Sequence, residues 1–489
     1  MGIRTGAAFL DGVRDGRELW VDGERIGDVT TDARFAGGAR TTAELYDLQH
    51  DPALVDTMTY VSPTSGDRVG LSFIEPRNAA DLAARRGMVK IWHDYTCGMF
   101  GRSPDFLNVM LSSMAAAQDA FSASGGDFAG NVRAYYEYVR EGDLAATHAL
   151  VSPQVDRSRP LDQQEKDIAA TVVGDNDKGI VIRGARMLAT LAAFSDELLV
   201  MPAPSYPLPE TEEARAHAFG FAIPIATPGL RLIARPSVMH LGAGAPADFP
   251  LAARFDDSDC VVIFDDVLVP WERVFIYRDV EVYNRIHSHT HVSIQTAHQF
   301  ATKDLAKAEF MRDLAMTLAH AANTDRYQHV QGMLAELINM ASFVEAALIA
   351  AEANTDPGPG DTVIPGRRFL QSVRFMFPPM FRRACEIIQN IGAGGMMMVP
   401  SVAMLDSPVS PDIERYFQAA NADSNMRIRL FRLAVDAAMS SFSGRQQLYE
   451  RYFAGDPVRA MAAYYETSDK EAPRQRIAKL LDDMETRWG

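Results

Sequence analysis

The stretch GDNDKGIVIRGARMLAT, residues 174–190, decides the fold class, because its pattern of residue types differs from that of the chain on either side. It combines β-branched residues with Gly, Asn and Asp, and three similar runs follow it. They are SDELLVMPAP (195–204), HAFGFAIPIATPGLRLIAR (217–235) and DCVVIFDDVLVPWERVF (259–275). Short β-rich runs cut by Gly, Pro, Asn and Asp predict a small antiparallel barrel or sandwich.

Both flanks carry helical periodicity, with apolar residues spaced by three and four positions. The clearest such segments are 78–101, 106–121, 300–321 and 426–453. Asp-Gly within RELWVDGERIGDV (17–29) predicts a short hairpin, and the Pro- and Gly-rich piece 355–366 predicts a loop between two helices. We therefore expect three units, namely an N-terminal helical domain (1–150), a β-barrel domain (151–275) and a C-terminal helical bundle (276–489).

The composition narrows the range of functions. The chain has 489 residues, of which 47% are hydrophobic and 23% are charged, as in ordinary globular proteins. A net charge of −16 argues against a nucleic-acid partner, because phosphate binding needs a basic surface. Cys97, Cys260 and Cys385 are too far apart to suggest a disulfide framework or a CxxC zinc site. Without an unbroken apolar run of about 18 residues or a signal peptide, we expect a cytoplasmic protein.

Two clusters of candidate site residues precede the β-rich region. In GRSPDF (101–106) a proline turn places Arg102 on a rigid corner, four residues before Phe106. In THALVSPQVDRSRP (147–160) His148 precedes a second Ser-Pro turn, which is followed by Gln154, Val155, Asp156 and Arg157. A histidine titrates near neutral pH and can move a proton in catalysis. A single histidine near a helix end is more often a capping or packing residue, so both interpretations stay open.

Two further clusters lie in the β-rich region and near the C-terminus. GIVIRGARMLAT predicts a strand pair around Gly184, with the polar Thr190 at its end. In SSFSGRQQLYERYF (440–453) the small residues Ser441, Ser443 and Gly444 precede Arg445. Small residues let a backbone approach a ligand closely, and arginine can bind a phosphate with two hydrogen bonds. A helix break with a solvated arginine is the alternative.

Two other motifs predict less chemistry. His287, His289 and His291 would share one face of a strand, but their surroundings look helical or loop-like and no nearby cysteine completes a ligand set. We therefore predict no metal site. The segment GAGGMMMVP (392–400) lacks GxGxxG spacing after a strand, so a Rossmann nucleotide site is not expected. Its three methionines suit an adaptable apolar contact in the core or at a subunit interface.

The order of the motifs carries a resemblance to a known family. GRSPDF, THALVSPQVDR, GIVIRGARMLAT, FDDVLVPWERVF, NIGAGGMMMVPS and SSFSGRQQLYERYFAGDPVR follow one another along nearly the whole chain. In this order they resemble the oxygenase component of two-component, flavin-dependent phenol monooxygenases of the 4-hydroxyphenylacetate 3-monooxygenase type. The resemblance implies an α+β fold similar to acyl-CoA dehydrogenases, with an N-terminal helical domain, a central antiparallel β-barrel and a C-terminal four-helix bundle, assembled as a homotetramer.

The resemblance also implies a reaction. FAD would lie between the β domain and the bundle, and would arrive as diffusible FADH2 from a separate NAD(P)H-dependent flavin reductase. Reduced flavin and O2 would form a C4a-hydroperoxide that delivers an oxygen atom to an electron-rich ring. A fixed cation near the ring oxygen stabilises the developing phenolate, and a closed apolar site protects the hydroperoxide from water.

The family's functional residues map onto individual positions of this chain. Arg102 is implied as the cation, and His148 as the partner that hydrogen-bonds the phenol and flavin region. Flavin-contact stretches are implied at Gln154, Val155, Asp156, Arg157, Thr190, Ser441, Ser443, Gly444 and Arg445. His298 matches a family His-Gln pair near the active site.

One departure from the family pattern limits the substrate. The corner usually ends in Tyr, whose hydroxyl reaches the phenolic oxygen, but this chain has Phe106. A buried oxygen left without that hydrogen bond would cost about 1–3 kcal/mol. A substituted phenol, an aminobenzoate or a carrier-tethered aromatic is therefore as suitable a substrate as 4-hydroxyphenylacetate.

Three alternatives share the fold. A dehydratase of the 4-hydroxybutyryl-CoA type needs a [4Fe–4S] cluster with two cysteines four residues apart, whereas Gly101 stands four residues after Cys97. An acyl-CoA dehydrogenase needs a glutamate base, and no suitable glutamate is evident. A non-catalytic flavin-binding protein would have no reason to keep Arg102, His148 and the Ser-Gly-Arg segment together.

Overall fold

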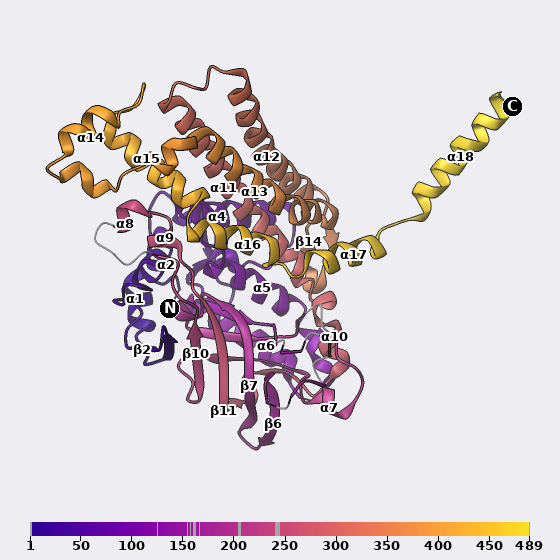
Figure 1. The fold of residues 1–489 in the computed structure, drawn as a ribbon. Coiled ribbons are helices and arrows are strands. Elements are labelled where there is room, and N and C mark those ends of the chain that lie inside the picture. Colours follow the sequence, from indigo (N-terminus) through magenta and orange to yellow (C-terminus); the bar gives the residue numbers. More distant parts are fainter. Residues whose placement is uncertain are drawn as a thin grey trace.

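The computed structural model describes residues 2–488 apart from 125, 154, 157, 160–162, 166, 204–206 and 240–244. Helices precede and follow a region of strands, and Figure 1 shows the strands gathered below the long C-terminal helices. The N-terminal helices are α1 (Gly6–Gly12), α2 (Ala36–Leu48), α3 (Val55–Met58), α4 (Ala79–Tyr95), α5 (Pro104–Ala116) and α6 (Phe128–Gly142). Both helical segments expected before residue 150 are therefore present, as α4 and α5.

The predicted N-terminal hairpin is confirmed. Strands β1 (Glu18–Val21) and β2 (Glu24–Ile26) pair antiparallel. Asp22 and Gly23 between them have φ values of 53° and 81°, the left-handed conformations that a two-residue hairpin turn needs. Strand β1 also pairs in parallel with β10 (Leu230–Ala234), so the hairpin extends the main sheet.

Two sheets form the β region. The six-stranded sheet has the order β2-β1-β10-β11-β7-β6, and the four-stranded sheet has the order β12-β9-β8-β5. The remaining strands of these sheets are β5 (Ala146–Ala149), β6 (Thr171–Asn176), β7 (Gly179–Thr190), β8 (Glu197–Val200), β9 (Phe219–Pro224), β11 (Asp259–Pro270) and β12 (Val274–Tyr277). Phe221 of β9 meets Phe264 of β11 edge to face at 5.9 Å, so the two sheets share one apolar core.

Two small strand pairs lie outside the β region, and three short helices lie within it. The two-stranded sheets are β3 (Thr59–Val61) with β4 (Arg68–Gly70) and β13 (Asp356–Pro357) with β14 (Val363–Ile364). The short helices are α7 (Glu212–Arg215), α8 (Ala245–Asp248) and α9 (Ala252–Phe255).

The expected strand pair around Gly184 is wrong. The segment forms one continuous strand, β7, which pairs with β6 on one side and β11 on the other. Gly184 has a φ of +107°, and a Cβ there would lie 2.5 Å from the carbonyl oxygen of Ala169. The glycine therefore serves a close backbone approach inside a strand, where the sequence had suggested a turn.

The C-terminal region is a bundle of long helices. Its helices are α10 (Val280–His289), α11 (Val292–Ala321), α12 (Gln328–Ala353), α13 (Arg367–Met397), α14 (Ser410–Tyr416), α15 (Ser424–Ala438) and α16 (Ser441–Tyr452). The segment between α12 and α13 holds the two-residue strands β13 and β14 and a short 3-10 helix, Pro359–Asp361, in agreement with the predicted loop. Helices α17 (Pro457–Thr467) and α18 (Glu471–Trp488) extend away from the body of the chain in Figure 1.

The bundle helices are strongly apolar. Two of them, Gln328–Ala353 and the stretch Arg367–Asp406, are long and apolar enough to cross a membrane by length and composition. Core helices of soluble proteins pass the same test, so this is weak evidence for a membrane span. In the methionine run Met396 is buried, whereas Met397 and Met398 are 78% and 73% exposed. The run is therefore mostly a surface feature of a single chain.

Candidate active site

The GRSPDF turn leads directly into helix α5. Pro104 is the first helical residue, where a missing N–H costs no hydrogen bond, and Ser103 holds the N-cap position. A Cβ on Gly101 would lie 2.5 Å from Cζ of Tyr449. Only glycine allows helix α16 to approach this closely. The local sequence and the packing against α16 together hold the backbone at Arg102 rigidly.

A buried polar network lies behind the turn. Ser103 Oγ donates to Asp105 Oδ1 over 2.5 Å, and Gln299 Nε2 donates to Asp105 Oδ2 over 2.7 Å. His93 Nε2 lies 3.3 Å from the same Oδ2. All four side chains are buried. Sequence analysis missed this network, because its members come from α4, α5 and α11. Ser103 and Asp105 belong to the GRSPDF motif and Gln299 to the His-Gln pair, but no local pattern joins them to His93.

Arg102 is buried and only partly paired. Its Nη2 donates to the carbonyl oxygen of Phe453 over 3.1 Å, and its guanidinium carbon lies 3.8 Å from the centre of the Phe106 ring. Nη1 is buried and has no hydrogen-bond partner among the described residues. Buried donors are normally satisfied, so an unpaired guanidinium nitrogen indicates a position for a ligand oxygen.

His148 lies in the middle of strand β5, not near a helix end as the sequence suggested. Strand β5 pairs in parallel with β8, which places His148 opposite Leu199. The short run Ala146–Ala149 carries little strand signal by itself, and its conformation depends on this pairing. Burial and the positive charge of Arg102 hold the pKa of His148 well below its ordinary value, so the imidazole is neutral at neutral pH.

The structure brings three predicted site residues together. The rings of Phe106 and His148 meet edge to face at 5.6 Å, while Arg102 lies over the same Phe106 ring. Nδ1 of His148, like Nη1 of Arg102, is buried without a hydrogen-bond partner in the described part of the chain. A cation and a neutral imidazole thus lie around one aromatic ring, and both have unused hydrogen-bonding capacity.

Two of the predicted flavin-contact residues converge on one carboxylate. Thr190 Oγ1, at the end of β7, donates to Asp259 Oδ1 over 2.7 Å. Arg445 Nη2, on α16, donates to Asp259 Oδ2 over 2.8 Å. Asp259 at the start of β11 therefore joins the β region to the bundle, and no local sequence pattern signals this contact across 186 positions.

The surroundings of Asp259 are strongly charged. Burial by itself would raise its pKa, but Arg445 and Arg235 offset that effect and lower the pKa to about 2. Burial raises the pKa of the neighbouring Asp257 to about 6, although Arg445 Nη2 lies 2.7 Å from its Oδ1. Arg445 is therefore engaged by two carboxylates, and its Nη1 is buried without a hydrogen-bond partner among the described residues. The alternative interpretation of this segment, a solvated arginine, is therefore wrong.

The start of α16 has an open surface. Ser440 caps the helix by accepting a hydrogen bond from the backbone N–H of Ser443 over 3.2 Å. Ser441 and Gly444 are exposed, and a Cβ on Gly444 would meet no atom within 4 Å. The first N–H groups of a helix lack intrahelical partners and attract anions. This end of α16 can therefore accept a phosphate-bearing ligand.

The second predicted flavin stretch lies partly outside the described residues, since Gln154 and Arg157 do not belong to them. Of its other members, Val155 is 66% exposed. Asp156 accepts a hydrogen bond from Ser158 Oγ over 2.6 Å. The described part of the stretch therefore makes only local contacts at the surface.

His298 contacts a different network from the ring site. It is buried in α11, where Nε2 lies 2.9 Å from Glu352 Oε1 and Nδ1 lies 3.2 Å from Arg85 Nη2. Burial lowers the pKa of His298 to about 4. Of the predicted His-Gln pair, Gln299 is the residue that reaches the turn, through Asp105.

The three alternating histidines do not share a strand face. His287 and His289 belong to the last turn of α10, and His291 precedes α11 with a left-handed φ of 52°. His287 Nε2 lies 2.7 Å from the carbonyl oxygen of Pro202. Among the described residues, no group of three or more His, Cys, Asp or Glu side chains is placed to hold a metal ion.

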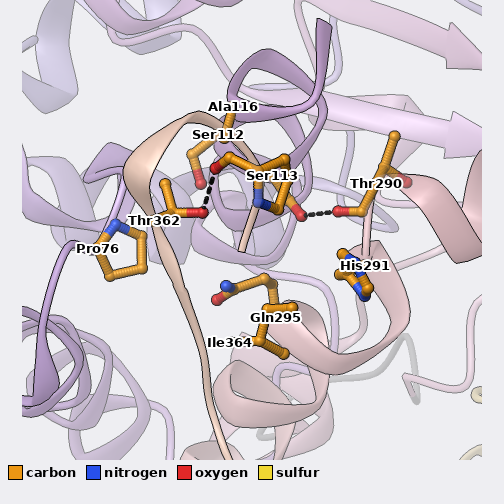
Figure 2. A pocket seen from close by; sticks show the side chains of 10 residues that line it. Pro76, Ser112, Ser113, Ala116, Thr290, His291, Gln295, Thr362 and Ile364 are labelled. Atoms are coloured by element: carbon orange, nitrogen blue, oxygen red, sulfur yellow. Dashed lines mark hydrogen bonds between the residues drawn. The ribbon is translucent and has the colours of Figure 1, made fainter. Parts of the chain in front are cut away.

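A small cavity near His291 is separate from the ring site (Figure 2). It has about 10 Å³ of space, roughly the room for one water. Ser113 Oγ donates to the carbonyl oxygen of Thr290 over 2.6 Å at its wall, and Thr362 Oγ1 donates to that of Pro359 over 2.6 Å. The cavity lies against the C-terminal half of α5, away from Arg102 at its start, and is too small for an aromatic substrate.

Comparison with known proteins covers almost the whole chain. Residues 5–276 match the family model for the 4-hydroxyphenylacetate 3-hydroxylase N terminal, and residues 283–482 match its C-terminal counterpart. The chain is 40% identical over 482 residues to the 4-hydroxyphenylacetate 3-monooxygenase oxygenase component of Thermus thermophilus, covering 98% of both chains. It is 30% identical to a Streptomyces globisporus monooxygenase of a carrier-bound (3S)-3-amino-3-(3-chloro-4-hydroxyphenyl)propanoyl group, covering 92% of this chain and 85% of that one.

Solved structures agree. A crystal structure of an HpaB oxygenase component with FAD and 4-hydroxyphenylacetate has a TM-score of 0.92 at 40% identity, covering 99% of this chain and 100% of that one. A 4-hydroxybutyryl-CoA dehydratase from N. maritimus has a TM-score of 0.85 at 20% identity, covering 99% of this chain and 95% of that one, which shows a shared fold only. The expected acyl-CoA dehydrogenase-like fold class is thereby confirmed, and the chain belongs to the 4-hydroxyphenylacetate 3-hydroxylase family.

Proposed function

We propose that this chain hydroxylates the ring of a phenol-like substrate whose oxygen binds between Arg102 and His148. The family is one of flavin-dependent aromatic monooxygenases, and the chain is an enzyme of this kind that uses FAD and O2. The single observation that carries the assignment of the site is the pair of unpaired buried nitrogens, Nη1 of Arg102 and Nδ1 of His148, around the Phe106 ring.

The two side chains have complementary tasks. The fixed positive charge of Arg102 stabilises the phenolate that develops as the ring is attacked. His148 stays neutral because its pKa is held low, and a neutral imidazole both donates and accepts a hydrogen bond. It can therefore hydrogen-bond the phenolic oxygen without adding a second positive charge beside Arg102. The Phe106 ring keeps water from the face that it covers.

The residues near Asp259 fit FAD. The open N-terminus of α16 suits a diphosphate, and Arg445 offers an unpaired buried nitrogen close to it. Thr190, at the end of β7, contacts the same Asp259 carboxylate as Arg445. When bound in its reduced form, FAD together with O2 supplies the electrophilic oxygen atom that the ring receives. We assign Ser441, Ser443, Gly444, Arg445 and Thr190 to hold it.

The proposed substrate class rests on what the relatives share. The names of the relatives describe action on 4-hydroxyphenylacetate, on 4-nitrophenol in Rhodococcus, and on a carrier-bound chlorohydroxyphenyl group. All three contain a phenolic hydroxyl and differ in the remaining substituents. Because Phe106 offers no hydrogen bond, we propose a phenol whose oxygen is held by Arg102 and His148 alone, either free or tethered to a carrier.

We also propose a partner protein and an oligomeric assembly for this chain. An oxygenase component implies a separate reductase, and we propose an NAD(P)H-dependent flavin reductase in the cytoplasm. We propose a homotetramer, supported by exposed apolar side chains on the bundle helices. They are Ile338, Ile349, Met376, Met397 and Met398.

The dehydratase alternative lacks the residues that its chemistry needs. Gly101, four positions after Cys97, packs against the Tyr449 ring and leaves no room for a side chain. Burial raises the pKa of the Cys97 thiol to about 11, which disfavours the thiolate that ligates iron. A brown iron–sulfur absorption in the purified protein would reverse this assignment.

A substrate screen tests the proposed function. The full-length protein is mixed with candidate phenols, FAD, NADH and any flavin reductase, and products are scored by mass. Gain of one oxygen atom by a phenol, absent without the oxygenase, is the expected result. Consumption of reduced flavin to H2O2 with every phenol, and no oxygenated product, would show that the site does not hydroxylate.

A further inference from the structure

One helix face contacts the Arg102 turn at three successive points. Gln446 Nε2 of α16 donates to the carbonyl oxygen of Met99 over 2.7 Å. Tyr449 Oη, one turn later, donates to the carbonyl oxygen of Gly101 over 2.8 Å. Arg102 Nη2 donates to the carbonyl oxygen of Phe453, directly after the helix. The backbone and the side chain of the turn are thus both held by α16 and the residue that follows it.

The same helix begins at the proposed flavin site. Arg445 lies one turn before Tyr449, and its guanidinium carbon is 5.6 Å from the centre of the Tyr449 ring. The guanidinium carbon of Arg102 is 5.9 Å from that centre. Phe453 stacks on the Tyr449 ring at 5.0 Å with planes 13° apart. Tyr449 is therefore the side chain that contacts both the proposed flavin-binding arginine and the proposed substrate-binding arginine.

A buried charge cluster fixes the rotation of α16. Glu450 Oε1 accepts from Lys303 Nζ over 2.6 Å and from Lys307 Nζ over 2.5 Å. Lys307 Nζ also donates to Gln446 Oε1 over 2.9 Å. Both lysines and Glu450 are buried. Charges removed from water hold one geometry, because any rotation that separates them leaves a buried charge unpaired.

The other side of the turn packs on helix α11, which carries both lysines. Gly98 has a φ of +62°, and a Cβ there would lie 2.6 Å from the backbone nitrogen of Lys307. The segment from Gly98 to Arg102 is thus clamped between α11 and α16. The cluster of Lys303, Lys307 and Glu450 ties these two helices together directly beneath it.

We propose that Tyr449 is a positioning residue for hydroxylation, which sets the Arg102 guanidinium relative to the flavin-binding end of α16. The inference rests on the proposed function. Its hydroxyl fixes the backbone next to Arg102, its ring sets the spacing from Arg445, and the Glu450 cluster holds the helix in register. Tyr449 itself touches neither reacting atom in this assignment.

The test removes one oxygen atom from the full-length enzyme. Tyr449→Phe keeps the ring, so the stacking and the fold are retained, and only the hydrogen bond to Gly101 is lost. Tyr452→Phe is the matched control, because Tyr452 is on the same helix and is 46% exposed. Each protein is measured for melting temperature, FAD dissociation constant, KM for the best phenol, and product formed per reduced flavin consumed.

We expect Tyr449→Phe to raise the KM for the phenol and to lower the yield of product per reduced flavin. The two effects should combine to about fivefold, since one hydrogen bond is lost. FAD affinity should stay within about twofold of wild type, and Tyr452→Phe should match wild type in every measurement. A purely structural role for Tyr449 would change the melting temperature but neither KM nor the yield per flavin.

The outcomes separate the two proposals. If the wild-type enzyme hydroxylates a phenol and Tyr449→Phe has the same KM and yield, the inference is refuted and the proposed function stands. If the wild-type enzyme hydroxylates no phenol at all, the proposed function fails, and the inference that rests on it fails with it.

Discussion

Arg102 offers the sharpest test of the site, through the substitution Arg102→Ala. The change removes a guanidinium that lies 3.8 Å from the centre of the Phe106 ring and whose Nη1 has no hydrogen-bond partner in the described chain. In the proposed complex that nitrogen binds the phenolate oxygen. The substitution should therefore weaken catalysis at the ring while leaving the contacts near Asp259 in place.

The size of the effect follows from the type of contact. A hydrogen bond to a charged group contributes about 1.5–3 kcal/mol, which corresponds to roughly 10- to 150-fold in rate. The developing negative charge on the phenolate places the loss in the transition state, so most of it should appear in kcat/KM for hydroxylation. Reduced flavin should still be consumed, and H2O2 should replace product.

The assay measures both fates of the reduced flavin. Oxygenated product is quantified by mass and H2O2 by a peroxidase-coupled dye, at matched concentrations of FADH2 from a flavin reductase. FAD affinity is followed by quenching of flavin fluorescence, and should remain within about twofold, because Arg445 and Thr190 are untouched. Arg415→Ala, an exposed arginine on α14, is the matched control.

Two results would contradict the assignment. Hydroxylation by Arg102→Ala at the wild-type rate would show that the guanidinium does not contact the developing phenolate. Equal loss of FAD affinity and of product would show that Arg102 belongs to the flavin site or to folding. Only loss of product with retained flavin binding supports the proposed role.

Three further predictions concern other parts of the structure. Phe106→Tyr should raise kcat/KM for simple para-substituted phenols by about fivefold, the value of one added hydrogen bond; an unchanged kcat/KM would indicate a pocket of different shape. Asp259→Asn should weaken FAD binding by roughly tenfold in a fluorescence titration, because a charge-assisted contact to Arg445 is lost. Asp266→Asn, at the exposed part of the same strand, should leave FAD binding unchanged. Burial lowers the pKa of His298 in the folded state to about 4, against an ordinary value of 6.5. As the pH falls, the unfolded chain therefore binds a proton at this histidine before the folded state does. The stability that neutral His298 contributes should thus be complete above pH 6.5 and fall by about 1.4 kcal/mol per pH unit toward pH 4. His298→Asn should remove that part of the pH dependence of the denaturant midpoint, and identical slopes for wild type and variant would refute the shift of the His298 pKa.

The sequence was sufficient to predict those features whose structure depends on residues close by in the chain. The turn before α5 follows from Pro104 at the first helical position, and the hairpin follows from Asp22 and Gly23 at its two left-handed positions. The order of motifs then identified the family, which the comparisons confirm. These features need no knowledge of distant contacts.

The predictions were wrong or incomplete where contacts between residues far apart in the chain determine the local structure. His148 was expected near a helix end, because four residues give no strand pattern, and only the pairing with β8 makes the segment a strand. Gly184 was interpreted as the turn of a strand pair, since the need for a glycine inside the strand becomes visible only when the backbone of Ala169, just before β6, lies beside it. The link between Arg445 and Asp259 spans 186 positions and has no local pattern.

The position of Arg102 can be followed back to these distant contacts. The turn supplies stiffness, but its place in space is fixed from two sides, by Asp105 with Gln299 and by helix α16 through Tyr449. Both supports are long-range, and both consist of hydrogen bonds with defined geometry, which apolar packing would not provide. The proline therefore explains why the arginine is held rigidly. The buried polar contacts around it explain where it is held, and so why its guanidinium lies over the same Phe106 ring that His148 meets.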